Sequence, residues 1–429
     1  MNLKTRLVAL LFAALCSTVV SADLTVVIRE GVSDAIPVAI IPFGVSGSTS
    51  PPLDIAAVVD ADLARSGRFA PMDRGDMIEK PTSGSEVDFA DWRLLGAEVV
   101  AVGSVGESPD GRYAIGFQLF DVVRGEQLLA YTIPARPDAL RAAAHQVSDL
   151  IYEALTGERG AFSTRIAYIS SKDGEYELIV ADADGANQQV VVRSDEPLMS
   201  PAWSPDSTRL AYVAFENYGS AVYVQELASG QRSRVSARPG VNGAPAWSPD
   251  GKRLALALSD DWGNVDVHVV EFATATLDRV TRHSAIDTEP VWSADGKSLF
   301  FTSDRAGGPQ IYQVAAGGGK PQRVTFEGNY NARPRLAPSQ QKIAVVHNDR
   351  GNYRIALVDL GSGATQVLTK GRLDESPSFS PNGSMIIYAT EDSGLGVLAA
   401  VSTDGRFHQQ LVSRLGDVRE PVWSPFAVP

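Results

Sequence analysis

The stretch Pro245-Ala-Trp-Ser-Pro-Asp-Gly251 decides the fold, because five related copies of it recur along the chain. The six copies begin at Pro201, Pro245, Pro290, Pro334, Pro377 and Pro421, so the steps between them are 44, 45, 44, 43 and 44 residues. A fixed period of this length is typical of repeat architectures, in which each unit buries its surface against its neighbours. Each unit is predicted to contain strands only, and such an array most simply closes into a ring. The sequence therefore predicts a β-propeller.

Each repeat carries the signals of four strands. The third position of the phrase is large enough to fill the space between twisted sheets, and is occupied by Trp203, Trp247, Trp292, Phe379 and Trp423. The Ser-Pro-Asp-Gly tail favours a type I turn. An apolar strand, a third strand, a Gly-rich or Asp-Gly turn and a fourth strand then follow, which makes one propeller blade. We expect the tryptophans to be core residues and not ligand-stacking ones.

The two ends of the repeat region predict how the ring closes. Arg165-Ile-Ala-Tyr-Ile-Ser170 matches Arg209-Leu-Ala-Tyr-Val-Ala214, but no Pro-x-Trp phrase precedes it. Conversely, Pro421-Val-Trp-Ser-Pro425 is not followed by strands of its own. The C-terminal strand is therefore expected to complete the blade that begins near Phe162. This predicts six blades over residues 161–429, and pairing the first blade with the last removes an open edge.

Residues 1–22 predict a secretory signal peptide. Lys4 and Arg6 precede an apolar run, and Val20-Ser-Ala22 supplies the small residues of a cleavage site. The run is too short to span a bilayer. Cys16, the only cysteine, is expected to leave with the leader, so the mature chain from Asp23 has neither a thiol nor a disulfide.

Residues 35–160 predict a small α/β domain. Strand patterns and two patterns of helical spacing alternate in this region, and together they predict helices that cover one mixed sheet. The strands are expected at Ile36 to Phe43, Glu98 to Val105, Tyr113 to Val122 and Gln127 to Ile133, and the helices at Leu53 to Ser66 and Ala139 to Leu155. A further short strand is expected at Leu24 to Ile28.

Charge and motifs exclude several classes of function. Removing Lys4 and Arg6 from 38 basic residues leaves 36 against 51 acidic residues, a net formal charge of −15. This argues against nucleic acid and anionic lipid as partners. Asp182-Ala-Asp184-Gly185 lacks the remaining ligands of a calcium loop. The chain has no zinc-binding histidine pair, nucleophile elbow, phosphate loop or dinucleotide fingerprint. We therefore expect no catalytic residue, no metal site and no cofactor.

One enzymatic alternative stays open. Carboxylates around the mouth of a propeller channel could act as acid and base on a glycan.

The chain resembles the TolB family, the soluble periplasmic proteins of the Tol–Pal system of the Gram-negative envelope. The resemblance covers the whole chain, and the combination of leader, N-terminal domain and repeat is what makes it specific. It is carried by Leu24-Thr-Val-Val-Ile-Arg-Glu-Gly31, Pro37-Val-Ala-Ile-Ile-Pro-Phe43, Ala61-Asp-Leu-Ala-Arg-Ser-Gly-Arg-Phe69, Leu155-Thr-Gly157, Thr164-Arg-Ile-Ala-Tyr168 and Pro197-Leu-Met-Ser-Pro-Ala-Trp-Ser-Pro-Asp206.

The resemblance implies a non-catalytic adaptor with two protein partners. The first is the C-terminal domain of TolA, an inner-membrane protein, which the mature N-terminus of such proteins engages. Carried over to this chain, that segment is Asp23, Leu24, Thr25, Val26, Val27, Ile28, Arg29, Glu30, Gly31, Val32, Ser33 and Asp34. β-prone residues near a terminus can add a strand to a partner sheet. The same segment could instead be an edge strand of its own domain, and both hold if it docks in one state and is released in another.

The second implied partner is Pal, the peptidoglycan-associated lipoprotein of the outer membrane, which such propellers receive at their mouth. If the Pro-x-Trp strand is innermost, the loops that enter it lie at one mouth. These loops give the Pal-binding set Ser200, Asn242, Gly243, Ala244, Thr288, Glu289, Arg333, Asp374, Glu375, Arg419 and Glu420. The alternative for the glutamates is that they only solvate the rim.

The function that the resemblance implies is to maintain outer-membrane integrity and to support outer-membrane constriction at cell division, in the periplasm and without membrane insertion. Other outer-membrane proteins and imported bacteriocins are further partners that it implies. The alternative is a periplasmic propeller hydrolase or glycan-binding protein with its site in the channel.

Overall fold

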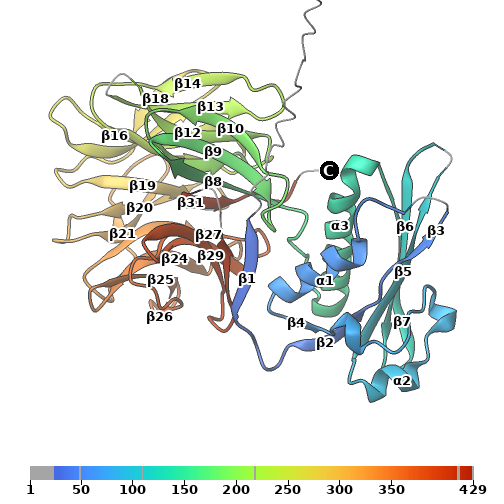
Figure 1. Cartoon of the computed structure of the whole chain (residues 1–429). Coiled ribbons are helices and arrows are strands. Elements are labelled where there is room, and N and C mark those ends of the chain that lie inside the picture. Colours follow the sequence, from blue (N-terminus) through green and yellow to red (C-terminus); the bar gives the residue numbers. More distant parts are fainter. Residues whose placement is uncertain (1–23, 48–49, 109, 217–218, 413–415, 428–429) are drawn as a thin grey trace, which may run out of the picture.

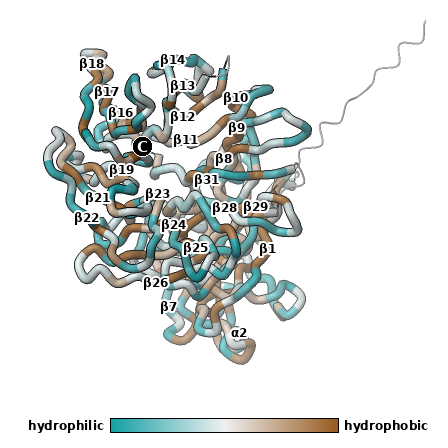
Figure 2. Tube along the Cα trace, turned by 90° about the vertical axis from the view of Figure 1, so that its left-hand side faces the viewer, coloured by the Kyte–Doolittle hydropathy of each residue, from teal (hydrophilic) through white to brown (hydrophobic). Residues whose placement is uncertain are grey.

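The repeated Pro-x-Trp segments form the innermost strands of six blades that surround a channel (Figure 2). The computed structural model describes residues 24–427 except 48–49, 109, 217–218 and 413–415, so the predicted leader and Asp23 lie outside it. The innermost strands are β31 (Asp417–Trp423), β11 (Leu198–Trp203), β15 (Asn242–Trp247), β19 (Asp287–Trp292), β23 (Asn331–Leu336) and β27 (Glu375–Phe379).

The three outer strands of each blade follow in antiparallel order. The second strands are β8 (Arg165–Lys172), β12 (Arg209–Glu216), β16 (Arg253–Ser259), β20 (Ser298–Ser303), β24 (Lys342–Asp349) and β28 (Met385–Asp392). The third strands are β9 (Glu175–Asp182), β13 (Gly219–Glu226), β17 (Val265–Glu271), β21 (Gln310–Ala315), β25 (Asn352–Asp359) and β29 (Leu395–Ser402). The fourth strands are β10 (Gln189–Ser194), β14 (Arg232–Ser236), β18 (Thr276–Arg279), β22 (Gln322–Arg323), β26 (Thr365–Val367) and β30 (His408–Val412). The predicted six-bladed propeller is confirmed.

The ring closes as the sequence predicts. The C-terminal strand β31 pairs antiparallel with β8 and completes the first blade. The Trp423 indole N–H donates to the Thr164 hydroxyl at 2.8 Å, and the Arg165 N–H donates to the Ser424 hydroxyl at 3.0 Å. The first and last parts of the propeller are therefore held by backbone and side-chain hydrogen bonds together.

The tryptophans of the repeat fill the gaps between blades. Trp203, Trp247 and Trp292 are buried, and each indole N–H donates to an innermost-strand carbonyl of the preceding blade at 3.0–3.2 Å. An arginine of the preceding blade lies over each ring, 4.5–4.8 Å from its centroid. The expectation that these rings are core residues is confirmed.

The segment before the α/β domain belongs to the propeller. Strand β1 (Thr25–Glu30) pairs antiparallel with β30 as a fifth strand of the last blade (Figure 1). Leu24 is buried in the same apolar cluster as Leu411 and Phe407. The interpretation of this segment as an edge strand of its own α/β domain is wrong, because a strand pattern specifies two faces but not the sheet edge that it joins.

The α/β domain has one mixed sheet, as predicted, in the order β4-β2-β5-β6-β7, with β3 also paired to β5. Strands β2, β3, β4 and β5 pair in parallel, and β5, β6 and β7 pair antiparallel. The strands are β2 (Ile36–Ile40), β3 (Gly44–Ser46), β4 (Phe69–Pro71), β5 (Val99–Glu107), β6 (Tyr113–Asp121) and β7 (Glu126–Ala135).

Helices cover both faces of this sheet. The predicted helices α1 (Ile55–Arg65) and α3 (Leu140–Thr156) lie on the face towards the propeller (Figure 1). The short α2 (Phe89–Leu94) buries Trp92 on the other face with Ile41 and Val102. The sequence pattern missed α2, because six residues are too few to display a helical period. Three 3₁₀ turns are at Arg74–Asp76, Gly84–Glu86 and Pro137–Ala139. Among the described residues, none of the helices is both long and apolar enough to cross a bilayer.

The turn after α1 is packed directly against the propeller, which gives a test of the domain contact. Gly67 has φ +68°, and a Cβ added there would lie 2.4 Å from Cγ of Phe407. Gly96 has φ +81° with nothing within 4 Å of such a Cβ. Both Gly→Ala substitutions carry the left-handed backbone cost of roughly 1–2 kcal/mol. We expect Gly67→Ala to lower the free energy of unfolding by about 1–3 kcal/mol more than Gly96→Ala, because it also overpacks the contact.

Urea titrations monitored by tryptophan fluorescence measure both variants. Equal losses of stability in Gly67→Ala and Gly96→Ala would contradict the packed domain contact.

Candidate functional site

The innermost strands all begin at one end of the channel, which we call the distal mouth and which faces away from the α/β domain (Figures 1 and 2). At that end every blade repeats one unusual backbone feature. The residue before each repeat proline is left-handed, and the pairing of the innermost strand is shifted there. These residues are Ser200, Ala244, Glu289, Arg333, Ser376 and Glu420, with φ between 46° and 55°. Left-handed backbone is unfavourable for such residues, so the blade geometry imposes it six times.

This ring holds a charge network that the period alone did not predict. The Arg333 guanidinium lies 3.2 Å from Glu289 and 3.4 Å from Glu420, and also donates to the Ser376 hydroxyl. Burial would lower the pKa of Arg333, but the Glu420 and Glu289 carboxylates raise it above its ordinary value. Glu289 also accepts from the Thr302 hydroxyl at 2.8 Å, and Glu420 accepts from the Ser200 N–H. Arg333 is thus connected to four of the other five ring positions, to three of them directly and to Ser200 through Glu420.

The network bears on the enzymatic alternative. An acid–base pair of carboxylates needs one group that is free to carry a proton. Both channel glutamates are instead ion-paired to the same arginine. No described feature of the channel favours hydrolysis over binding.

Two residues of the predicted Pal-binding set, Asn242 and Asp374, are buried. Asn242 is 1% exposed and its side chain accepts from the Ser236 hydroxyl at 2.6 Å and donates to the Arg238 carbonyl at 2.7 Å. Asp374 is 0% exposed and accepts from the Thr390 hydroxyl at 2.6 Å. Burial raises the pKa of Asp374. The side chains of Asn242 and Asp374 form hydrogen bonds within the propeller, so these two residues stabilise the rim and are not exposed to a partner.

The other predicted residues do gather at the distal mouth. Gly243, Ala244, Thr288 and Glu289 are partly exposed on adjacent blades, as are Ser200 and Arg333. Arg419 is half exposed and lies 3.8 Å from Glu375 of the neighbouring blade. Glu420 is the most enclosed of the charged members, with a side chain 12% exposed.

The predicted Pal-binding set leaves out the apolar residues around this charged ring. Exposed apolar side chains lie in the loops and at the strand starts of the distal end, at Met199, Val241, Ile286, Leu373, Phe326, Leu395 and Trp262, the last of which is 93% exposed. A signal was present, because Val241, Ile286 and Leu373 each lie four residues before a repeat proline. An apolar patch around polar groups is typical of protein interaction sites.

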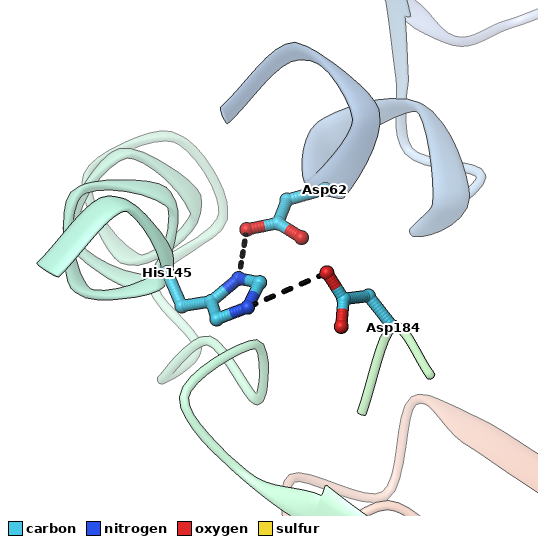
Figure 3. A group of neighbouring side chains, drawn as sticks. All are labelled: Asp62, His145 and Asp184. Atoms are coloured by element: carbon cyan, nitrogen blue, oxygen red, sulfur yellow. Dashed lines mark hydrogen bonds and ion pairs between the residues drawn. The ribbon is translucent and has the colours of Figure 1, made fainter. Parts of the chain in front are cut away.

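A second cluster lies where the domains meet, and Figure 3 shows its three central side chains. His145 of α3 is 2% exposed, with Nδ1 2.7 Å from Asp62 of α1 and Nε2 3.5 Å from Asp184 of the β9–β10 turn. Arg65 lies 3.0 Å from the Asp62 carboxylate, and Arg141 donates to Asp184 at 3.0 Å. Two carboxylates and their cations thus join the α/β domain to the propeller.

The carboxylates of Asp62 and Asp184 and the imidazole of His145 are close enough together to bind one metal ion. Their potential ligand atoms lie within 4.8 Å of one another. The donor set does not fit one. Both carboxylates are already paired with guanidinium groups, and a further cation would be repelled by Arg65 and Arg141. The segment Asp182 to Gly185, which resembles part of a calcium loop, also has carboxylates that already have partners. Asp182 accepts a hydrogen bond from Asn187 at 2.7 Å, and Asp184 is ion-paired with Arg141.

The neighbours of His145 set its protonation. Burial would lower the pKa of His145, but the Asp62 and Asp184 carboxylates raise it above its ordinary value. Burial would raise the pKa of Asp62, but Arg65 and His145 lower it. The cluster is therefore an ion-paired clamp between the domains in its charged form.

The predicted TolA-binding segment and the predicted Pal-binding residues lie in different places. Residues Leu24 to Asp34 are at the outer edge of the last blade, where Glu30 pairs with Lys370 at 2.8 Å and Arg406 lies 3.5 Å from Asp34. Thr25 to Glu30 occupy β1, and Gly31 to Asp34 lead to the α/β domain. The structure therefore separates the two predicted sites, one at the channel and one at a blade edge.

Comparison with known proteins gives matches along nearly the whole chain. The family model described as "TolB amino-terminal domain" matches residues 24–128, and the one described as "TolB beta propeller domain" matches residues 152–427. The Tol-Pal system protein TolB of Xanthomonas campestris pv. campestris is 50% identical over 410 residues, which cover 94% of this chain and 93% of that protein. The corresponding protein of Xanthomonas oryzae pv. oryzae is 51% identical over the same shares. The crystal structure of TolB from Acinetobacter baumannii superposes with a TM-score of 0.87 at 40% identity, covering 94% of this chain and all of that one.

The clamp predicts a pH-dependent stability. Because the folded pKa of His145 is raised, its contribution is fully present below the unfolded pKa of about 6.5 and is lost as pH rises through the folded value. The contribution of Asp62, whose pKa is lowered, is instead lost as pH falls through its folded value. We expect His145→Gln to cost about 1–3 kcal/mol at pH 6, and to remove the part of the pH dependence that arises as pH rises through the raised pKa of His145.

Urea titrations at each pH measure this effect, with His283→Gln as the control because His283 is an exposed histidine. The interpretation fails if His145→Gln and His283→Gln have the same pH profile.

Proposed function

The chain belongs to the TolB family of Tol-Pal system proteins, and from that membership we propose that it is a non-catalytic adaptor of the cell envelope. In this proposal it binds Pal at the distal mouth and TolA through residues Asp23 to Asp34. It works in the periplasm, where it maintains outer-membrane integrity and supports outer-membrane constriction at cell division. Other outer-membrane proteins and imported bacteriocins are further partners of the proposed adaptor.

The observation that carries the Pal proposal is the distal mouth itself. It faces away from the α/β domain, so neither that domain nor the N-terminal segment covers it (Figure 2). Exposed Val241 and Ile286 directly precede the innermost strands of the third and fourth blades, and the same mouth carries the charged residues Glu289, on the fourth blade, and Arg419, on the first. Interfaces combine desolvated apolar anchors with a polar rim that fixes orientation. The mouth offers both in one surface.

The TolA proposal is supported by the way in which β1 is attached. It is an edge strand, with one side paired to β30 and the other unpaired among the described strands. Its ion pairs with Lys and Asp side chains, Glu30 with Lys370 and Arg29 with Asp392, lie on the surface, where such pairs contribute little. A strand of this kind can pair with a partner sheet at its free edge or after release. The side chain of Ile28, which is exposed, would then be buried against the partner.

A substitution at the apolar rim tests the first half of the proposal. Val241 at the distal mouth is 46% exposed, and Val367 on β26, at the outer edge of a blade, is 38% exposed. We expect Val241→Asp to weaken the binding of soluble Pal about tenfold or more, because a charge would be desolvated in the interface. Val367→Asp should leave the affinity unchanged. Calorimetric titration of each variant measures the Kd, and equal affinities would remove the rim from the proposed site.

A reversible crosslink tests the second half. Val27 and Gln410 are directly opposite in the β1–β30 pair, which is within the reach of a disulfide, and the mature chain has no cysteine of its own. We expect the Val27→Cys, Gln410→Cys variant to lose TolA binding when oxidised, if TolA takes the released strand, and to regain it on reduction. Pal binding should be the same in both states.

The crosslink has a clear contrary outcome. If the oxidised variant binds the TolA C-terminal domain as tightly as the reduced one, TolA does not take the released strand. A protein that binds neither partner in either state would sink the adaptor proposal as a whole.

A further inference from the structure

One position of the repeat is occupied differently in the fifth blade. The residue that follows each repeat proline is Ala202, Ala246, Val291, Arg335, Ser378 and Val422 in successive blades. Five of the six are small or apolar, and only Arg335 is charged. All but Ser378 line the channel cavity inside the ring of the distal mouth. The repeat thus places a single guanidinium among small side chains.

The two arginines of the fifth blade have different surroundings. Arg333 takes both channel glutamates as partners. Arg335 makes one hydrogen bond, from Nη1 to the Pro334 carbonyl at 2.9 Å, and forms no ion pair with any carboxylate in the described part of the chain. Burial lowers the pKa of Arg335, although the charges of Glu289 and Glu420 act in the opposite direction. Arg335 is only partly exposed, so a carboxylate bound directly to its guanidinium would compensate for lost solvation.

The cavity beside Arg335 has room for a ligand. It measures about 220 Å³ and is lined by indole rings, repeat prolines and small side chains, in addition to the charged residues of the mouth. A water molecule takes about 30 Å³ in the liquid, so the space admits a small organic acid or the end of a side chain. Apolar walls strengthen an ion pair formed between them. A planar guanidinium matches a carboxylate with two parallel hydrogen bonds.

We propose that Arg335 anchors a carboxylate-binding site inside the propeller channel. The guanidinium faces the cavity with nitrogens that no described residue occupies, and the carboxylate completes its pairing. Two sources could supply this carboxylate. One is a free small organic acid, and the other is the Asp or Glu side chain of a protein bound at the distal mouth. The second source rests on the proposed function.

The first experiment uses trifluoroacetate as the probe and the full mature protein. We expect the ¹⁹F resonance of trifluoroacetate to broaden in the presence of the protein, and acetate to reverse the broadening. Arg335→Val should abolish the effect, or weaken the affinity at least tenfold, and it is expected to fold because Val291 and Val422 occupy the same position in other blades. Arg350→Gln, which removes an arginine 93% exposed on the surface, should behave like the unaltered protein.

Broadening that persists in Arg335→Val, or that acetate does not reverse, would overturn the proposal. Arg335→Lys keeps the charge and loses the planar fork, so it should bind the probe more weakly than arginine does. If Arg335→Val does not fold, an affinity of Arg335→Lys equal to that of the unaltered protein would count against the site just as directly.

A second arm distinguishes the two sources. If a partner side chain supplies the carboxylate, soluble Pal should displace trifluoroacetate, and Arg335→Val should weaken Pal binding about tenfold. If the site serves a free acid, Pal should bind Arg335→Val and the unaltered protein equally. If Pal binds neither protein, the proposed function fails, while the response to trifluoroacetate still decides whether the carboxylate site exists.

Discussion

The structure depends on the contact between neighbouring blades through the repeat tryptophan. The ring fills the gap between two twisted sheets, its N–H bonds to the innermost strand of the preceding blade, and an arginine lies over its face. A blade cannot bury its faces alone, so each of these contacts contributes to the stability of two blades at once. Trp423 differs, because its indole N–H donates to Thr164, which directly precedes β8 of its own blade. Its contact with the preceding blade is made by its backbone N–H, which donates to the Ser378 hydroxyl of β27 at 3.0 Å.

The fifth blade departs from the repeat in two places, and both concern the channel. Its phrase, Pro334-Arg-Leu-Ala-Pro-Ser339, has Leu336 where most others have tryptophan, so it lacks the indole N–H contact. The same phrase brings Arg333 and Arg335 to positions that are uncharged or acidic in the other blades. One arginine gathers the glutamates of two other blades, and the other faces the cavity. The repeat provides the ring, and its least regular copy provides both of the positive charges that line the channel cavity.

Periodicity predicted the features that depend on short-range pattern, and it was silent on those that depend on distant partners. The six blades, the closure through β31 and the helices α1 and α3 follow from spacing alone. The partner of β1 does not, because β30 lies almost four hundred residues further along the chain. In the sequence, Asn242 and Asp374 have the pattern of exposed loop residues. Their burial is explained by hydrogen bonds from the hydroxyls of Ser236 and Thr390, which the local sequence does not reveal. The clamp joins Asp62, His145 and Asp184 from three separate elements, and no local motif marks them.

The two attachments of the N-terminal region to the propeller differ in kind. The α/β domain is held by a buried cluster in which each charge has a partner, and breaking such a cluster leaves a charge without one. Strand β1 is held by backbone pairing, by the buried side chain of Leu24 and by surface ion pairs that solvent screens. Removing the strand exposes little charge and one short sheet edge. The domain and the strand are covalently continuous through residues 31–35 but are held by different interactions, so we expect release of the strand to leave the buried cluster between the domains intact.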